Sequence, residues 1–423
     1  MEELLEIKYK KFTLKNGLEV ILYKNESFPT VAVNIWYKVG SANEKPDKTG
    51  FAHLFEHMMF QGSQNVPKEK HFKYVQEAGG SLNGSTSMDR TNYYETLPLD
   101  SLELALWLES DRMGYFLPAL TKEKLDNQKD VVMNERRQNY DNQPYGLAWE
   151  ILFSNLFPQN HPYHWPTIGW MKDIEKFEMD DVKNFFANYY APNNASLVIG
   201  GNFEEDNAID LVKKYFEEIP NQNKIENIEI NFSELETSKK IKHEDNIQLS
   251  KLYFAWRSEK GYGKYDAALD VLADILTGSK SSRLQKHLIH NLQIAQDVSA
   301  FQYSAKYDGA FFITTTAQLN CNLEKLKEET FNILNQIISE GITDLELERA
   351  ITSYKSSYIY SLQNLDNLVN QINNYNCNLG EPNSIVYDIN RYLRLTKEDI
   401  KNAAKLFLDK NFVELHIIPK QKN

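Results

Sequence analysis

The order of hydrophobic and polar positions predicts both strands and helices in the first half of the chain. Residues 30 to 44, TVAVNIWYKVGSANE, open with an apolar run that is typical of a buried strand. Residues 50 to 63, GFAHLFEHMMFQGS, instead repeat apolar positions at helical spacing. Residues 121 to 143 predict a charged helix that begins with Thr121 and Glu123 as a capping signal.

The same succession of elements is found again in the second half. The strand-like stretch 248 to 261 echoes residues 30 to 44, and the helical stretch 266 to 279 echoes residues 50 to 63. Both helical stretches end in Gly-Ser. A repeat of about two hundred residues fits two related domains rather than a solenoid, whose periods are roughly 20 to 50 residues.

A change in composition marks the predicted boundary between these domains. Residues 221 to 246 are rich in Asn, Lys and Glu. We place an N-terminal domain at residues 1–225 and a C-terminal domain at residues 226–423. The expected fold class is α+β, with two related domains that are each a mainly antiparallel sheet covered by helices.

Composition excludes several classes of protein. Hydrophobic residues make up 42% of the 423 residues, which is enough for sizeable cores, and the net charge of −12 argues against nucleic-acid binding. No apolar run approaches the ~18 residues of a membrane span, and the N-terminus is too charged for a signal peptide. We expect cytoplasmic localisation, or periplasmic if a leader has been removed. Two cysteines, Cys321 and Cys377, exclude a disulfide scaffold.

The segment HLFEH combines two histidines and a glutamate on one helical face. At about 100° per residue, His53, Glu56 and His57 share a face opposite the apolar residues. Imidazoles four residues apart can converge on one metal ion, and Glu56 is placed to take a proton from a water molecule. The alternative is a pair of surface or capping histidines, because short motifs also occur by chance.

Catalytic zinc needs a third protein ligand. The charged helix carries Gln128, Val131, Val132 and Glu135 on one stripe. A lone glutamate on a charged helix is usually solvated, so spacing alone does not select Glu135.

Together with HLFEH, the segments DVVMNERRQNYDNQPYG (130 to 146) and GGSLNGSTSMDRTNYYETLP (79 to 98) resemble the pitrilysin and mitochondrial-processing-peptidase family of zinc peptidases, the inverzincins. The resemblance extends over essentially the whole chain. It implies that His53, His57 and Glu135 bind one Zn²⁺ ion per chain and that Glu56 is the general base.

The resemblance also suggests roles for residues around the metal. Gln128 stands where some relatives have a glutamate that supports the site, and an amide can hydrogen-bond but adds no negative charge. Asn83, Gly84 and Ser85 fall where the family has an edge strand that binds substrate as an added strand. Without the resemblance, these three residues would be interpreted as a polar turn.

The second half lacks the metal motif. An ungapped superposition of the two helical stretches places three apolar residues opposite His53, Glu56 and His57, namely Leu269, Leu272 and Ala273. Single-chain relatives also carry an Arg and a Tyr, seven residues apart, that bind substrate and stabilise the oxyanion. The corresponding residues here are Ile289 and Gln296, and the nearby His287 and His290 read as surface residues.

These features favour a zinc metalloendopeptidase subunit that cleaves unfolded peptides or small proteins in a closed cavity. The missing Arg and Tyr predict a heterodimer with a related subunit that carries them, with a homodimer as second choice. The alternative is a non-catalytic peptide-binding or assembly subunit of the same family. A protein with two fortuitous histidines is a third possibility. His161 and His164 are compatible with purely structural roles, and we do not assign them as metal ligands.

Overall fold

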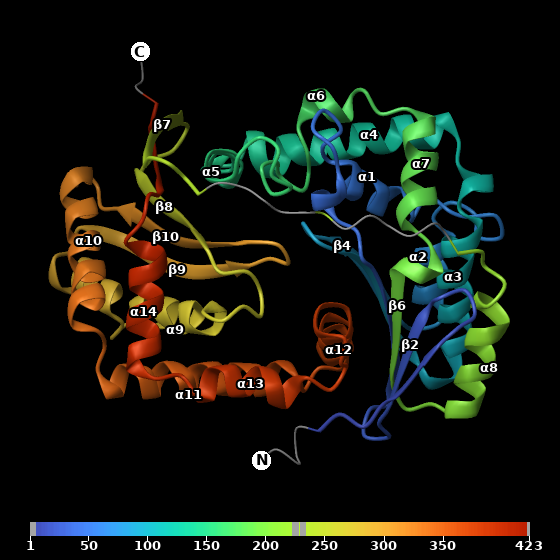
Figure 1. Ribbon diagram of the computed structural model, residues 1–423. Helices are drawn as coiled ribbons and strands as arrows, with labels where there is room; N and C mark the ends of the chain where they lie inside the picture. Colours follow the sequence, from blue (N-terminus) through green and yellow to red (C-terminus); the bar gives the residue numbers. More distant parts are fainter. Residues whose placement is uncertain (1–5, 222–227, 229–233, 421–423) are drawn as a thin grey trace. The chain divides into compact units, whose positions relative to one another are not determined.

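The structure of the chain, a computed structural model, describes residues 6–221, 228 and 234–420. The domain boundary expected at residues 225 and 226 lies outside these described residues. Each of two compact units contains one sheet covered by helices (Figure 1), which confirms the α+β fold. Unit 1 comprises Met1–Arg136, Trp165–Glu229 and Ile359–Val386, and unit 2 comprises Arg137–His164, Ile230–Tyr358 and Tyr387–Asn423.

Unit 1 is built on a six-stranded sheet with the order β1-β2-β6-β3-β5-β4. Strands β2 and β6 run parallel, and the other neighbouring pairs run antiparallel. The apolar run of β3 is buried almost throughout, as its sequence predicts. The strands are β1 (Lys10–Thr13), β2 (Glu19–Lys24), β3 (Thr30–Tyr37), β4 (Ser81–Thr86), β5 (Thr91–Pro98) and β6 (Ala195–Gly201).

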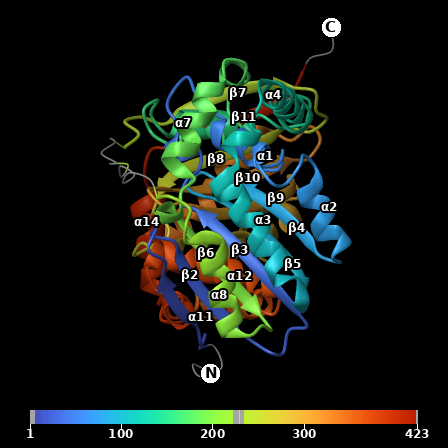
Figure 2. The same ribbon diagram turned by 90° about the vertical axis from the view of Figure 1, so that its right-hand side faces the viewer.

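Helices cover both faces of this sheet. Figure 1 shows α3 and α8 on one side and α12 on the other, and Figure 2 shows α3 and α8 in front of the strands. The unit 1 helices are α1 (Phe51–Met58), α2 (Lys70–Glu77), α3 (Leu102–Tyr115), α4 (Lys122–Arg136), α6 (Met171–Ile174), α7 (Met179–Tyr189), α8 (Glu205–Phe216) and α12 (Leu365–Leu379).

Unit 2 contains a five-stranded sheet with the order β7-β11-β8-β10-β9. Strands β7 and β11 run parallel and the other pairs run antiparallel. When β1 is left out, the two sheets have the same order with the parallel pair at the same place, which confirms the internal repeat. The strands are β7 (Lys239–Asp245), β8 (Lys251–Ser258), β9 (Ala295–Ser304), β10 (Gly309–Ala317) and β11 (Val413–Pro419).

The helices of unit 2 enclose a hydrophobic core that includes Trp256, Leu272 and Ile313. On the sheet's other face, Phe153 and Trp149 of α5 pack against the Phe312 ring. None of the described helices is long and apolar enough to cross a membrane. The helices are α5 (Ala148–Leu156), α9 (Asp266–Thr277), α10 (Leu323–Glu340), α11 (Asp344–Ser361), α13 (Ile385–Leu393) and α14 (Lys397–Leu408), with π-helical turns at Arg137–Asp141 and Gln285–Asn291.

One helix of each unit comes from the opposite half of the sequence. Helix α12 follows unit 2 elements in the chain yet packs on β6 and β3 of unit 1. Helix α5 precedes the second sheet by about eighty residues yet packs on β11 and β8 of unit 2. The compact units therefore follow the two sheets rather than a single cut in the sequence.

Candidate functional site

The helix that carries the histidines begins without a side-chain cap of its own. Its N-cap residue is Gly50, which has a left-handed φ of 89° and no side chain. The buried Glu44 takes over this role: its Oε2 accepts the Gly50 N–H at 2.9 Å, and its Oε1 accepts the Ala52 N–H at 2.7 Å. These bonds satisfy amides that a helix start otherwise leaves unpaired, and they fix α1 at its first turn.

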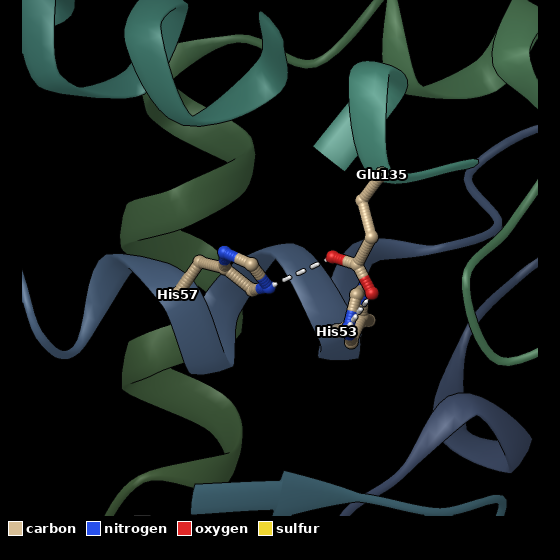
Figure 3. A group of neighbouring side chains, drawn as sticks. All are labelled: His53, His57 and Glu135. Atoms are coloured by element: carbon tan, nitrogen blue, oxygen red, sulfur yellow. Dashed lines mark ion pairs between the residues drawn. The ribbon is translucent and has the colours of Figure 1, made fainter. Parts of the chain in front are cut away.

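The three predicted ligands lie together in unit 1. Nε2 of His57 is 3.4 Å from one carboxylate oxygen of Glu135, and Nε2 of His53 is 3.8 Å from the other (Figure 3). One potential ligand atom from each residue lies within 4.8 Å of the others. Helix α1 supplies both imidazoles and α4 supplies the carboxylate, so packing of α4 against α1 completes the group.

This set of donors fits zinc. Two imidazole nitrogens and one carboxylate oxygen are zinc ligands of a kind that leaves a fourth position open. Zinc binds neutral imidazole. Burial, together with the nearby His57 ring, lowers the pKa of His53 to about 4, so this ring is neutral at physiological pH.

Glu56 is held beside the ligands by the neighbouring strand. Its Oε2 accepts a hydrogen bond of 2.6 Å from the hydroxyl of Thr86, the last residue of β4. Burial raises the pKa of Glu56, and the Thr86 hydrogen bond and the positive charge of Arg90 oppose that rise. Because burial raises its pKa and one hydroxyl holds it in place, the Glu56 carboxyl group is suited to exchange a proton.

The predicted substrate-binding residues Asn83, Gly84 and Ser85 lie on β4, the edge strand of the first sheet. The expected edge position is thus confirmed, and the alternative of a polar turn is wrong. The Gly84 amide donates to the exposed Asn83 Oδ1 at 2.9 Å, and the Ser85 hydroxyl donates to Asn92 Oδ1 at 2.7 Å. An edge strand offers unpaired main-chain groups to an extended peptide.

Gln128 is buried on α4, seven residues before Glu135. Its Nε2 donates to Oδ1 of the adjacent Asn127 at 2.9 Å. The hydrogen bond described for Gln128 therefore goes to a neighbour on its own helix, and the predicted support of the metal ligands stays a prediction.

His161 and His164 have structural partners within unit 2. Nε2 of the buried His161 is 3.4 Å from Asp308, which also pairs with Arg257. Nδ1 of His164 is 2.8 Å from the Phe157 carbonyl oxygen. Both contacts place these histidines in the framework of the second unit.

Two other groups of metal-binding residue types occur among the described residues. Glu324 and Glu414 already form ion pairs with lysines, such as that of Lys327 with Glu414 at 2.5 Å, and His416 pairs with Glu414. In the buried group of His71, Glu95 and Glu109, the guanidinium of Arg112 bonds to Glu109. Its positive charge disfavours a second cation there, so the group on α1 and α4 is the best candidate metal centre among the described residues.

The second unit corrects the expected alignment by one residue. Leu269 and Leu272 are fully buried in the core rather than facing a site. The partly exposed positions of α9 are Asp270, Asp274 and Thr277, which share their spacing with His53, His57 and Phe60 in the first half. The ungapped superposition fails because it aligns the two Gly-Ser pairs, which lie at different distances from the helix ends. Gly62 lies four residues after the end of α1, whereas Gly278 directly follows α9. The motif is absent in either alignment.

Neither position expected for the Arg and Tyr carries such a residue. Ile289 packs against the hydrophobic core of unit 2, and Gln296 is exposed on β9. Nε2 of His287 is 2.7 Å from Glu329, and His290 is exposed, in line with the surface roles expected of them.

Sequence reasoning missed two residues that shape the site, Glu44 and Thr86. Glu44 lies in a loop six residues before Gly50, where no local pattern marks a remote helix cap. For Thr86, strand alternation predicts only that it shares a face with Gly84, and the structure is needed to show that this face meets Glu56.

Both halves of the chain match models of one protein family. The family model described as "Insulinase (Peptidase family M16)" matches residues 19–166, and the model described as "Peptidase M16 inactive domain" matches residues 176–354. The second match covers the half that lacks the metal motif.

Relatives with similar sequences are named as zinc proteases. The zinc protease PqqE of Helicobacter pylori is 30% identical over 363 residues, covering 84% of this chain and 80% of its own. The uncharacterized zinc protease YmxG of Bacillus subtilis is 25% identical over 412 residues, which cover 97% of this chain and 98% of the relative. A crystal structure of a protease from Helicobacter pylori matches with a TM-score of 0.90 and 27% sequence identity. The match covers 98% of this chain and 100% of that protease chain.

The resemblance read from three short segments therefore extends along the whole chain. Both halves match family models, the fold matches that of a solved protease, and the relatives carry the name zinc protease. The chain belongs to peptidase family M16, the zinc peptidases that include pitrilysin and the mitochondrial processing peptidase.

Proposed function

We propose that this chain is the zinc-binding subunit of a metalloendopeptidase that hydrolyses unfolded peptides or small proteins in a closed cavity. The observation that carries the proposal is the convergence of His53, His57 and Glu135, with Glu56 held between them and the edge strand β4. His53, His57 and Glu135 would hold one zinc ion per chain.

The chemistry follows from this arrangement. Zinc, when bound, supplies the positive charge that polarises the scissile carbonyl and lowers the pKa of the attacking water. The Glu56 carboxylate accepts a proton from this water as the water oxygen bonds to the carbonyl carbon. Glu56 then returns the proton to the leaving nitrogen as the C–N bond breaks. The net reaction consumes one water molecule per peptide bond.

Substrate would bind as an extended strand along β4. Asn83, Gly84 and Ser85 offer main-chain groups at the sheet edge, and main-chain hydrogen bonds select an extended conformation more than a sequence. This mode of binding suits unfolded peptides, because a folded substrate has few free strands to add.

We further propose that a related subunit supplies the Arg and Tyr. Loss of one oxyanion donor typically lowers the rate about 10²- to 10³-fold, so a chain with Ile289 and Gln296 at these positions should be slow alone. A homodimer is the second choice, in which each chain works without the pair.

A non-catalytic peptide-binding or assembly subunit is the second candidate function. The match of residues 176–354 to the model described as inactive favours it, because the sequence of that half has no counterpart of the HLFEH motif. The intact set of three ligands and a base favours the peptidase instead.

The decisive experiment is hydrolysis of a quenched fluorescent, unstructured peptide by the zinc-loaded chain, alone and with a related subunit carrying Arg and Tyr. Glu56→Gln serves as the blank, because it should keep zinc and lose turnover. Turnover by the chain alone would support the homodimer. Turnover only with the partner would support the heterodimer. Activity retained by Glu56→Gln, or no activity in either case despite bound zinc, would refute the peptidase.

A further inference from the structure

Thr86 is a residue outside the metal motif that touches the proposed base. It ends β4 and shares a face of that strand with Gly84, where an added Cβ atom would stand 3.2 Å from Oε1 of Glu56. Its Oγ1 lies 2.6 Å from Oε2 of Glu56, and this is the shorter of its two side-chain contacts.

The second contact shows where the hydroxyl proton of Thr86 points. Oγ1 of Thr86 is 3.4 Å from Oγ1 of Thr91, its partner across the hairpin. Thr91 itself donates to the Val39 carbonyl oxygen at 3.0 Å, so its own proton is already engaged. Thr86 has one proton to donate, and a carboxylate at 2.6 Å is a stronger acceptor than a hydroxyl at 3.4 Å.

The two oxygens of Glu56 therefore have different surroundings. Oε2 is occupied by the Thr86 hydroxyl, whereas Oε1 lies over Gly84, 3.2 Å from where a Cβ atom would stand. The terminal torsion of a glutamate is soft, and its carboxylate rotates easily unless a neighbour holds it. The hydrogen bond from Thr86 limits this rotation.

We propose that Thr86 is the positioning residue of the base: by holding Oε2, it presents Oε1 to the water and the leaving nitrogen above the edge strand. The inference rests on the proposed peptidase function and deepens it. Oε1 takes one proton from the water while the C–O bond forms, and the same oxygen delivers it while the C–N bond breaks. Thr86 keeps its own proton throughout.

The test compares Thr86→Val, which keeps the branched shape and loses the hydroxyl, with Thr86→Ser, which keeps the hydroxyl. For Thr86→Val we expect kcat to fall about 10- to 100-fold with KM within about twofold of the parent and one zinc ion retained. Thr86→Ser should recover kcat to within about threefold. Equal losses in both variants, or an unchanged kcat in Thr86→Val, would overturn the proposal, because shape rather than the hydroxyl would then matter.

A second measurement separates this proposal from the peptidase function. Crystal structures of the zinc-loaded parent and of Thr86→Val should show one carboxylate orientation for Glu56 in the parent and a rotated or divided one in Thr86→Val. An unchanged orientation in Thr86→Val would overturn the positioning role whatever the activity. A parent protein that holds Glu56 as described yet hydrolyses no peptide would count against the peptidase function and leave the positioning of Glu56 by Thr86 intact.

Discussion

Gly84 of the edge strand lies directly against the carboxylate of Glu56. A Cβ atom at Gly84 would stand 3.2 Å from Oε1 of Glu56, 3.1 Å from the Phe60 ring and 3.2 Å from the Tyr93 ring. These distances are tighter than most contacts with a Cβ atom, so the absence of a side chain at Gly84 permits this close approach. The strand proposed to bind peptide and the proposed base therefore pack directly against each other.

Gly84→Ala should lower turnover about tenfold while zinc binding persists. The added methyl group must displace Glu56 or the rings beside it by a few tenths of an ångström, and small misplacements of reacting groups cost rate steeply. The measurement is kcat/KM together with zinc content, with Ser81→Ala on the exposed start of β4 as the control. Full activity in Gly84→Ala would show that the packing against Glu56 is not needed.

Removal of a ligand should abolish stoichiometric zinc. The parent should bind one zinc ion per chain, whereas Glu135→Gln, which loses the anionic donor, and His57→Ala should bind far less after dialysis. Elemental analysis measures the metal, and Glu56→Gln is the matched control that should keep it. In calorimetry, zinc at a thousandfold excess over its Kd should stabilise the parent by about 4 kcal/mol. A Glu135→Gln protein with full zinc would remove Glu135 from the ligand set.

Glu44→Gln should weaken both α1 and the metal centre. The amide of glutamine replaces one acceptor oxygen with a donor that faces a backbone N–H of Gly50 or Ala52. A buried hydrogen bond left unmade costs about 1–3 kcal/mol, and loosening the first turn should also lower zinc affinity. Chemical unfolding and zinc titration measure the two effects, and Glu26→Gln at an exposed position is the control. Unchanged values for both would show that Gly50 needs no remote cap.

The sequence predicted the shared helical face of the two histidines and Glu56 because their spacing is local. His53, Glu56 and His57 lie within five residues of one helix, so helical geometry alone places them on one face. Glu135 required the family resemblance, since contact between α1 and α4 is tertiary. Thr86 and Glu44 act through hydrogen bonds across 30 and 8 residues, and no periodic pattern encodes such pairs.

For the fold, the internal repeat could be predicted from the sequence. The packing of α5 and α12 on the sheet formed by the opposite half of the chain could not. Strand and helix patterns recur in both halves because each half must cover a similar sheet. The amphipathic pattern of α12 or α5 shows that each helix has a buried face. It does not show which sheet that face covers, because either sheet offers an apolar surface of similar kind.

The ion pair of Glu346 with Arg283 should make unit 2 sensitive to acid. Nε and Nη2 of Arg283 bond to the two carboxylate oxygens at 2.7 and 2.8 Å, and this pairing, opposed by burial, lowers the pKa of Glu346 to about 2. The folded pKa lies below the unfolded value, so the pair stabilises the protein above about pH 4.5 and loses this effect as pH falls towards 2.

Glu346→Gln should therefore lower the free energy of unfolding at pH 7 by about 1.5–3 kcal/mol, with a difference from the parent that shrinks below pH 4.5. Denaturant unfolding at a series of pH values measures this. Asp344→Asn breaks an exposed pair with Lys397 and should change stability by less than about 1 kcal/mol. A difference that stays constant down to pH 2 would contradict the assigned pKa.

The docking of α12 on the first sheet should depend on Asn370. Its Oδ1 accepts hydrogen bonds from Trp36 Nε1 at 3.0 Å and Asn92 Nδ2 at 3.2 Å. One turn later, Asn373 donates to the Asn34 carbonyl oxygen at 2.9 Å. Such paired polar groups fix the position of the helix along the sheet more closely than apolar contact alone, because hydrogen bonds form only at a narrow range of distances and angles.

Asn370→Ala removes the acceptor of Trp36 Nε1 and the nearer of two acceptors of Asn92 Nδ2, and it should lower the free energy of unfolding by about 2–4 kcal/mol. Asn367→Ala, at an exposed position of the same helix, is the control and should stay within about 0.5 kcal/mol of the parent. Hydrogen exchange should show faster opening of α12 in Asn370→Ala before the rest of unit 1 opens. Equal stability of the two variants would mean that apolar burial, such as that of Val369, is enough to place α12 on the first sheet.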